Sequence, residues 1–479
     1  MTQPQNAHTH SLSDGSSRAL RSSATVIGGG LAGAEAAWQL AVRGVPVTLL
    51  EMRPGTTSPA HRTGALAELV CSNSLKGTDP ATAAGLLKHE LESMGSLVLA
   101  EARLTSVPAG TALAVDRARF SDMITDTLES QPPVNVVRTE ATSIPPGPVI
   151  IATGPLTSPG LEPALASLVG SDRLAFYDAA APIVEGESID RRVLFEASRY
   201  DRGTGADYVN APMTREEYEA FVGALVKASR TEAHDFERRD LFAACQPIEE
   251  IARTGVDALR FGPLKPVGLT DPRTGSRPWA VVQLRSENLA RTAYNLVGFQ
   301  TNLTFPEQKR VFRMIPGLAG AEFLRFGVMH RNTFIDAPRL LDNTLALRHD
   351  RRIRLAGQIT GTEGYLEAAA SGLLAALNTF ADLQSLPPFR LPVDTALGSL
   401  IAYATNPDTT DYQPMHVNFG LLPALEQPER GKRARYVAFS ARARCALAET
   451  LSARADLRFD TARRAAERLP AEAPEVAHE

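Results

Sequence analysis

The sequence predicts an α/β protein in which a doubly wound domain is interrupted by an inserted α+β domain. Three observations support this fold class. A strand–glycine turn–helix–strand pattern opens the chain at residues 24–51, strand-like runs around one helix fill residues 181–327, and a second strand–glycine turn–helix pattern begins near residue 353. With 479 residues, of which 44% are hydrophobic, the chain can bury sizeable cores, which excludes wholesale disorder.

The first part of the doubly wound domain is expected at residues 24–180, after a disordered extension at residues 1–23. It opens with the strand ATVI, the helix LAGAEAAWQLAVRG, which ends at Gly44, and the strand VPVTLLE. Helical stretches are expected at 82–102 and 119–129. Two short β-branched runs follow, PVNVV and GPVIIATGP.

The inserted domain is expected at residues 181–327. Its strand-like runs, RRVLFEASRY, DYVNAPM, PWAVVQLR and AYNLVGFQT, surround the helix REEYEAFVGALVKA. The doubly wound domain resumes at residues 328–455 with RIRLAGQITG, a long helix rich in small residues, and a charged helix from about Gly431. Residues 456–479 are expected to fray.

Composition excludes several classes of protein. The 50 Lys and Arg against 54 Asp and Glu give a net charge of −4, which excludes a chain-wide basic coat but not a local basic patch. Cys71, Cys245 and Cys445 form neither a disulfide framework nor a CxxC metal pattern, so we expect no metal site and a cytoplasmic location. No apolar run approaches the roughly 18 residues of a membrane span, and no feature indicates an obligate protein partner.

The first glycine turn is a dinucleotide-binding fingerprint. The run Gly28, Gly29, Gly30, Leu31, Ala32 and Gly33 fits G-x-G-x-x-G between a strand and a helix, and Glu51 ends the next strand 18 positions later. Glycines let the backbone approach a pyrophosphate at the helix N-terminus, and the glutamate can accept hydrogen bonds from a ribose. This Rossmann-type motif is shared by FAD and NAD.

Two further segments favour FAD. Residues 149–155, VIIATGP, form a strand ending in Ala-Thr-Gly, as in two-dinucleotide-binding flavoproteins. AGQITGTEG places a second glycine turn before a helix, with Gly357, Gln358, Thr360 and Gly361 as further cofactor-binding candidates. No second G-x-G-x-x-G is present, so a nicotinamide reductant would have to bind outside a fingerprinted unit.

The chain closely resembles the folate-dependent, FADH2-oxidising tRNA (uracil-5-)-methyltransferases, the TrmFO family. The motifs that carry the resemblance span about residues 24–450: GGGLAGAEAAWQLA, EMRP, ELVCSNSLK, VPAGTALAVDR, FYDAAAPIV, SRYDRG, CQPIEEIA, RFGPLKPVGL, NLVGFQT, RFGVMHRN and AGQITGTEGY. The resemblance implies methylation of C5 of the T-loop uridine at tRNA position 54. It also implies methylenetetrahydrofolate as carbon donor, FAD as methylene carrier and hydride donor, and NAD(P)H as reductant.

By resemblance, Cys245 is the uracil nucleophile, and Cys71 is a second catalytic thiol that acts as the base or as a flavin-side partner. One departure concerns the nucleophile: the family usually has Phe-Glu-Gly-Cys where this chain has Phe242-Ala243-Ala244-Cys245. From the residues alone, both cysteines could equally be buried structural thiols. His330, Arg331 and Lys265 are the cations that could activate a thiol, and Cys445 is read as a packing residue.

RNA binding requires stacking groups and local positive charge. Phe176, Tyr177, Phe299 and Tyr365 are available aromatics, although each is more often a core residue. Two basic runs stand out, residues 431–444 and residues 348–354, and either could be an ordinary solvated face.

Three other functions remain open. A flavoprotein that modifies the wobble uridine together with a GTPase would carry a further C-terminal helical domain. An NAD(P)H-dependent flavin oxidoreductase for small molecules would need no uracil nucleophile. A non-catalytic flavin-containing protein that binds tRNA would show no turnover.

Overall fold

The computed structural model describes residues 23–58, 60–170, 173–179, 181–231, 246–327, 329–409, 412–427 and 429–457, with the backbone alone at residues 173–179 and 329–332. The expected N-terminal extension and nearly all of the expected C-terminal tail lie outside these ranges. So do the side chains of Phe176, Tyr177, His330 and Arg331, and the whole of Cys245.

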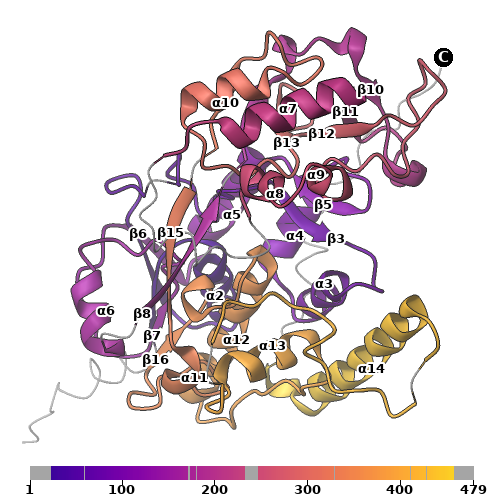
Figure 1. Ribbon diagram of the computed structural model, residues 1–479. Helices are drawn as coiled ribbons and strands as arrows, with labels where there is room; N and C mark the ends of the chain where they lie inside the picture. Colours follow the sequence, from indigo (N-terminus) through magenta and orange to yellow (C-terminus); the bar gives the residue numbers. More distant parts are fainter. Residues whose placement is uncertain are drawn as a thin grey trace, which may run out of the picture.

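A five-stranded parallel sheet forms the centre of the lower lobe in Figure 1. Its strand order is β16-β7-β1-β2-β6. The first strand, β1, therefore lies between β2 and β7 and pairs in parallel with both, as in Rossmann-type domains. The strands are β1 (Ala24–Ile27), β2 (Val47–Glu51), β6 (Val134–Arg138), β7 (Val149–Ile151) and β16 (Ile353–Leu355). The prediction of a doubly wound domain is confirmed.

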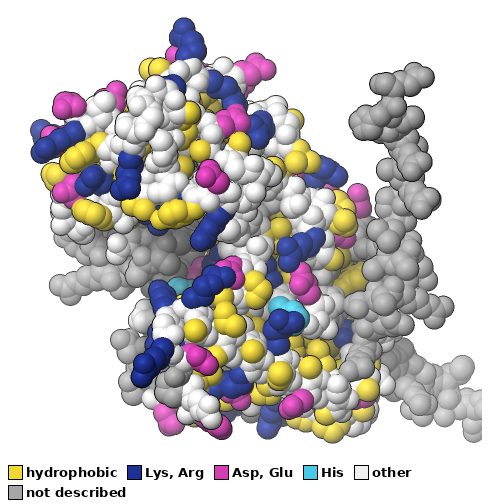
Figure 2. Space-filling model, turned by 90° about the vertical axis from the view of Figure 1, so that its right-hand side faces the viewer, with side chains coloured by type: hydrophobic (Ala, Val, Ile, Leu, Met, Phe, Trp, Pro, Cys, Tyr) yellow, Lys and Arg dark blue, Asp and Glu magenta, His cyan; other side chains and the backbone are white. Residues whose placement is uncertain are grey.

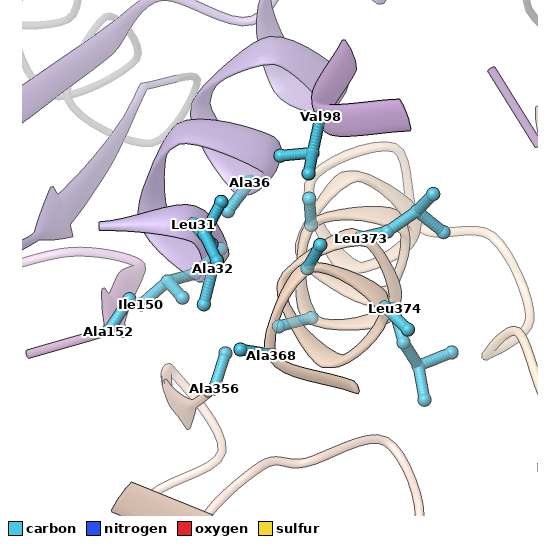
Figure 3. Packing of buried hydrophobic residues seen from close by; sticks show 14 of the residues in the cluster. Leu31, Ala32, Ala36, Val98, Ile150, Ala152, Ala356, Ala368, Leu373 and Leu374 are labelled. Atoms are coloured by element: carbon cyan, nitrogen blue, oxygen red, sulfur yellow. The ribbon is translucent and has the colours of Figure 1, made fainter. Parts of the chain in front are cut away.

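Two helices rich in small residues pack together beside this sheet. They are α2 (Leu31–Ala41) and α12 (Tyr365–Leu383), which lie more than 300 residues apart in sequence. A Cβ atom at Gly372 of α12 would lie 2.1 Å from the carbonyl oxygen of Ala32, so only glycine permits this approach. Figure 3 shows the two helices side by side, with Leu31, Ala32 and Ala36 on α2 and Ala368 and Leu373 on α12. The close contact brings the two glycine turns to the same place.

The long connection from β2 to β6 carries a small antiparallel sheet of β3 (Ser74–Gly77), β5 (Ala112–Val115) and β4 (Ser106–Val107). Its helices are α3 (Ala83–Ser93), α4 (Leu97–Leu104) and α5 (Arg117–Glu129). One helix was expected over 82–102, but Gly95, with φ +72°, separates two. The other helices of the lower lobe are α6 (Glu162–Val169), α11 (Ala337–Leu340), α13 (Ala396–Thr405) and α14 (Lys432–Ala453).

The upper lobe in Figure 1 is built on a six-stranded sheet with the order β10-β11-β12-β13-β9-β14. Its strands are β9 (Ile183–Glu185), β10 (Phe195–Glu196), β11 (Tyr208–Met213), β12 (Ala280–Ser286), β13 (Ala293–Leu296) and β14 (Phe323–Arg325). Its helices are α7 (Arg215–Lys227), α8 (Ile248–Arg253), α9 (Ala258–Phe261) and α10 (Phe305–Phe312). The expected strand RRVLFEASRY is mostly wrong, because Arg191–Val193 and Arg199–Asp201 form single 3-10 turns.

Two long antiparallel strands, β8 (Arg173–Ala179) and β15 (Met329–Ile335), pair where the chain leaves and re-enters the lower lobe. Each lobe has its own large hydrophobic core. These two features support the division that we propose, with residues 181–327 as the inserted domain and residues 24–180 and 328–455 as the two parts of the other.

Candidate active site

The fingerprint turn is shaped by contacts that exclude side chains. Gly28 has φ +100°, and a Cβ there would lie 2.6 Å from the carbonyl oxygen of Ala152. A Cβ at Gly33 would lie 1.8 Å from the carbonyl oxygen of Gly28. At Gly30, by contrast, a Cβ would meet no atom within 4 Å. Gly28 and Gly33 therefore build the turn, while the space at Gly30, where α2 begins, is open to a ligand.

Glu51 joins this turn to the end of β2. Its Oε2 accepts the N–H of Gly29 at 2.7 Å, and its Oε1 accepts the N–H and Nε of Arg53 at 2.9 and 2.8 Å. Burial alone would raise the pKa of Glu51, but the hydrogen bond and charge of Arg53 lower it below its ordinary value. The carboxylate is therefore ionised. Because Oε2 uses only one of its lone pairs, it can also accept a ribose hydroxyl.

The second glycine turn faces the first. Gly357 and Gln358 line the same cavity as Gly28, and the side chain of Gln358 donates to Glu363 at 2.7 Å. Thr360 and Gly361 lie inside the turn instead: Thr360 is fully buried and donates to the carbonyl oxygen of Gly357. Of the cofactor-binding candidates, the structure thus brings the residues from Gly28 to Ala32, Glu51, Gly357 and Gln358 to the lining of one cavity, whereas Gly33, Thr360 and Gly361 shape the backbone behind it.

A cavity of about 130 Å³, measured as the space that the centre of a water molecule can occupy, lies between the two turns. It runs from the residues around Gly30 past Arg53 and His61 to Tyr365 at the start of α12. Burial, and then the charge of Arg53, lowers the pKa of His61 to about 4, so this ring is neutral at physiological pH. The open space at Gly30 and the free acceptor capacity of Glu51 fit a dinucleotide such as FAD.

Cys71 lies at the Tyr365 end of the cavity. The Tyr365 hydroxyl oxygen accepts the N–H of Cys71 at 2.8 Å and the N–H of Ser72 at 3.1 Å, and it lies 3.0 Å from the Cys71 Sγ. A phenol oxygen has two lone pairs and one hydrogen. Because the two N–H groups use the lone pairs, the hydrogen is left for the sulfur, and this arrangement favours the thiolate of Cys71. Burial, followed by the charge of Cys71, raises the pKa of Tyr365 well above its ordinary value.

The residues after Cys71 are held by the upper lobe. Arg285, on β12, donates to Ser72 Oγ and to Asn73 Oδ1, both at 2.8 Å. The Asn73 side chain donates to the carbonyl oxygens of Val115 in the lower lobe and Ser286 in the upper lobe, at 2.9 and 3.0 Å. The polar sequence that follows Cys71 therefore fixes the thiol between the two lobes, and Cys71 is half-buried rather than freely exposed.

Two arginines lie close to this thiol. Arg117 is paired with Glu287 at 2.8 Å and donates to the carbonyl oxygen of Leu69 at 2.6 Å. In Arg325, on β14, the Nε and Nη2 atoms are buried and have no hydrogen-bond partner among the described residues. Burial, and then the charge of Arg117, lowers the pKa of Arg325. The negative charges that Tyr365 and Cys71 can carry raise this pKa and partly offset the decrease. In the described part of the chain, Arg325 is thus a cation with no ion-pair partner, and it lies within electrostatic reach of both side chains.

The other candidate residues separate into three groups. Cys245 lies in 232–245, outside the described residues, but both flanks of that segment are held beside residues 300–304: the N–H of Thr231 donates to Asn302, and the N–H of Ile248 to Gln300. Lys265 is exposed. Phe299 is fully buried in the core of the upper lobe, and Cys445 is exposed on α14, so its reading as a packing residue was wrong.

The two basic runs differ in how many of their cations have partners within the protein. All four arginines at 348–354 have protein partners, for example Arg354 with Asp382 and Arg351 with Asp342, which speaks for a structural role. On α14, Arg433 and Arg442 pair with aspartates, while Lys432, Arg435 and Arg444 are exposed.

Sequence reasoning missed the partners that organise Cys71. Arg325 stands in the quoted motif RFGVMHRN and Tyr365 in AGQITGTEGY, but their proximity to Cys71 depends on how the lobes meet. In the described ranges, no group of three His, Cys, Asp or Glu side chains could hold a metal ion. No described helix is both long and apolar enough to span a bilayer.

Known proteins match this chain over most of its length. The family model of glucose inhibited division protein A (GIDA) matches residues 23–387. Curated proteins named methylenetetrahydrofolate–tRNA-(uracil-5-)-methyltransferase TrmFO, from Symbiobacterium thermophilum and Heliobacterium modesticaldum, are each 56% identical over 88% of this chain and 95% of their own lengths.

A solved structure of Aquifex aeolicus GidA has a TM-score of 0.65 and 18% identity, covering 93% of this chain and 76% of that one, and it supports the fold. The identity over nearly the whole length of the curated relatives supports more than the fold. The chain belongs to the GIDA family and, with these relatives, to the TrmFO family of methylenetetrahydrofolate–tRNA-(uracil-5-)-methyltransferases.

Proposed function

We propose that this protein methylates C5 of uridine 54 in the T loop of tRNA, with methylenetetrahydrofolate as carbon donor, FAD as cofactor and NAD(P)H as reductant. The observation that carries the proposal is the cavity itself, which runs from the cradle at Gly30 to Tyr365, whose hydroxyl lies 3.0 Å from the Cys71 sulfur. A thiol at the far end of a dinucleotide cavity places a nucleophile or base beside a redox cofactor. A reducing, cytoplasmic location completes the proposal.

The residues that would hold FAD are those of the two turns. The N–H groups at the start of α2 would bind the pyrophosphate, Glu51 the ribose, and Gly357 and Gln358 the side opposite Gly28. When bound, FAD supplies the electrons that reduce the transferred carbon to a methyl group. Tyr365 and Arg325 would exclude water from the thiol end and set its charge.

Uracil C5 needs activation, because it is a poor nucleophile. We assign this to Cys245, whose thiolate would form a bond to C6 while the C5–C6 π electrons move onto the C4 carbonyl oxygen. After C5 has acquired the carbon, a base removes the C5 proton and the sulfur–C6 bond breaks, which restores the ring and the thiolate. Cys71, with the Tyr365 hydroxyl directed at its sulfur, is suited to be that base.

The test uses the whole protein with unmodified tRNA, NADH and methylenetetrahydrofolate labelled in its methylene carbon. A parallel reaction contains labelled S-adenosylmethionine instead. Label from the folate in 5-methyluridine 54 is the expected result. No label, despite bound and reduced flavin, would contradict the proposal and favour a small-molecule oxidoreductase.

Three cysteine variants refine the test. Cys245→Ser and Cys71→Ser should keep the flavin and lose methylation. Cys445→Ser is the matched control, since this thiol is exposed on α14, and it should retain full activity. Full activity of Cys245→Ser would remove that residue from the mechanism.

A further inference from the structure

Three phenylalanine rings form a parallel stack at the edge of the upper lobe. The ring centroids of Phe323 and Phe326 are 5.2 Å apart with an interplanar angle of 13°, and those of Phe326 and Phe305 are 4.8 Å apart at 15°. We call these three rings the aromatic column. Phe323 packs against the hydrophobic core of the lobe, whereas Phe305, at the other end, is 50% exposed. The column therefore runs from the core to the solvent and ends in an accessible ring.

The column is rigidly placed. Gln308, fully buried one turn after Phe305 on α10, donates to the carbonyl oxygens of Gly327 and Leu303 at 2.8 and 2.7 Å. Its Oε1 also accepts the N–H of Gly327 at 2.8 Å. These bonds tie the helix that carries Phe305 to the segment that carries Phe326. An exposed ring held in this way loses little entropy when a flat partner stacks on it.

The column is also continuous with the proposed active site. β14 pairs with β9, and the register shifts so that Leu324 is an extra, bulged residue between Phe323 and Arg325. Bulges re-aim the side chains beside them. Here Phe323 joins the column, whereas Arg325 approaches Cys71 and Tyr365. The residues that flank the Cys245 segment are held beside 300–304, immediately before Phe305.

Exposed cations lie at both ends of the path from Phe305 to Arg325. Lys309 lies one helical turn from Phe305 on the same face of α10, is exposed, and has no ion pair among the described residues. Arg62 is exposed, and its charge reaches Arg325. Figure 2 shows Lys and Arg side chains on both sides of the narrow region between the upper and lower parts of the molecule. Flat aromatic surface beside cations suits single-stranded nucleotides better than an apolar protein surface.

We propose that the aromatic column is a stacking platform for an unpaired nucleotide of the RNA, with Phe305 as the ring that contacts the base. The inference rests on the proposed function for the identity of the RNA. Base–aromatic stacking tolerates any base, because every base has a π face. The column would thus hold a nucleotide adjacent to the target uridine and steer the uridine toward Arg325 and Cys71.

The experiment measures binding of a T-arm hairpin RNA that carries 2-aminopurine beside the target uridine. Phe305→Ala should weaken binding at least fivefold, up to about a hundredfold, and should abolish the quenching of 2-aminopurine fluorescence. Phe305→Trp should restore both, whereas Phe305→Leu, which is apolar but lacks a flat ring, should not. The matched control is Leu324→Ala, because Leu324 is 58% exposed on the same strand but outside the column.

Each contrary outcome has a distinct meaning. Equal hairpin binding by wild type and Phe305→Ala, or equal binding by the Leu and Trp variants, would overturn the stacking platform. A Phe305-dependent change in molar mass by light scattering would assign the ring to a second copy of the chain and would also overturn it. Flavin content and NADH-driven flavin reduction without RNA should be unchanged in every variant. If wild type binds and quenches the hairpin but transfers no label, the proposed function fails while the platform stands.

Discussion

The Tyr365→Phe substitution tests the most specific geometric argument about the thiol. The change removes one oxygen atom and keeps the ring, so the cavity wall at the start of α12 stays in place. It removes the acceptor of two N–H groups, those of Cys71 and Ser72, and it removes the O–H group that lies 3.0 Å from the Cys71 sulfur.

The magnitude follows from these contacts. A hydrogen bond to a charged group contributes about 1.5–3 kcal/mol, so the thiolate fraction of Cys71 at neutral pH should fall about 10- to 150-fold. Each backbone N–H that loses its partner costs a further ~1–3 kcal/mol, unless water replaces the hydroxyl. The loop at Cys71 should therefore become less stable as well as less reactive.

The assay is alkylation of Cys71 by iodoacetamide in a Cys245→Ser, Cys445→Ser background, where it is the single thiol. The ratio of the rates at pH 7 and pH 10 reports the thiolate fraction and cancels any change in exposure. Tyr403→Phe is the control, because its hydroxyl donates to the carbonyl oxygen of Gln413 elsewhere. If Tyr365→Phe leaves the ratio unchanged or increases it, the phenol is not donating to the sulfur.

Three further predictions concern the cradle, the core and Arg325. Gly30→Ala should weaken FAD binding without changing the melting temperature of the cofactor-free protein. Gly33→Ala should lower both FAD affinity and melting temperature, since its Cβ would lie 1.8 Å from a carbonyl oxygen. The same loss of melting temperature in both variants would refute the assignment of Gly30 to the cofactor cradle. Burial raises the pKa of Glu90 to about 7 from 4.5, so the folded protein binds the proton more tightly and stability falls as pH rises from about 4.5 to 7; urea unfolding should show that Glu90→Gln removes about 3 kcal/mol of this dependence. Arg325→Met should lower methylation but raise the free energy of unfolding by about 1 kcal/mol, because it removes two buried nitrogens that make no hydrogen bond to described residues. A variant that unfolds more easily would show that Arg325 is structural.

The parts of the fold that the sequence predicted correctly are those set by hydrophobic period and glycine spacing over short stretches. The fingerprint turn and both strands around α2 were correctly placed, because period, glycine spacing and burial all act within about 30 residues. The run RRVLFEASRY failed at both ends, because Val193 and Tyr200 lie in 3-10 turns, the second of which holds Tyr200 at φ +59°. That conformation depends on contacts from distant segments, such as the hydrogen bond from the Tyr200 N–H to Gly268.

The candidate site divides in the same way. Gly28, Glu51 and Gly357 were identified as cofactor-binding candidates, since each has a steric or hydrogen-bonding requirement that is visible in a short motif. The partners of Cys71 were not, because Tyr365 is 294 residues away in sequence. Contacts of that length follow from the packing of α12 on α2, which no single motif encodes.

The inserted domain helps to position the Cys71 thiol. The thiol loop leaves the lower lobe, but Arg285 and Ser286 of the upper lobe hold Ser72 and Asn73. The Arg117–Glu287 pair closes the same junction. A shift of the upper lobe would therefore move the thiol relative to the cavity. The same lobe carries Arg325 and the aromatic column. The position of a nucleotide that stacks on Phe305 would therefore be fixed relative to the Cys71 thiol.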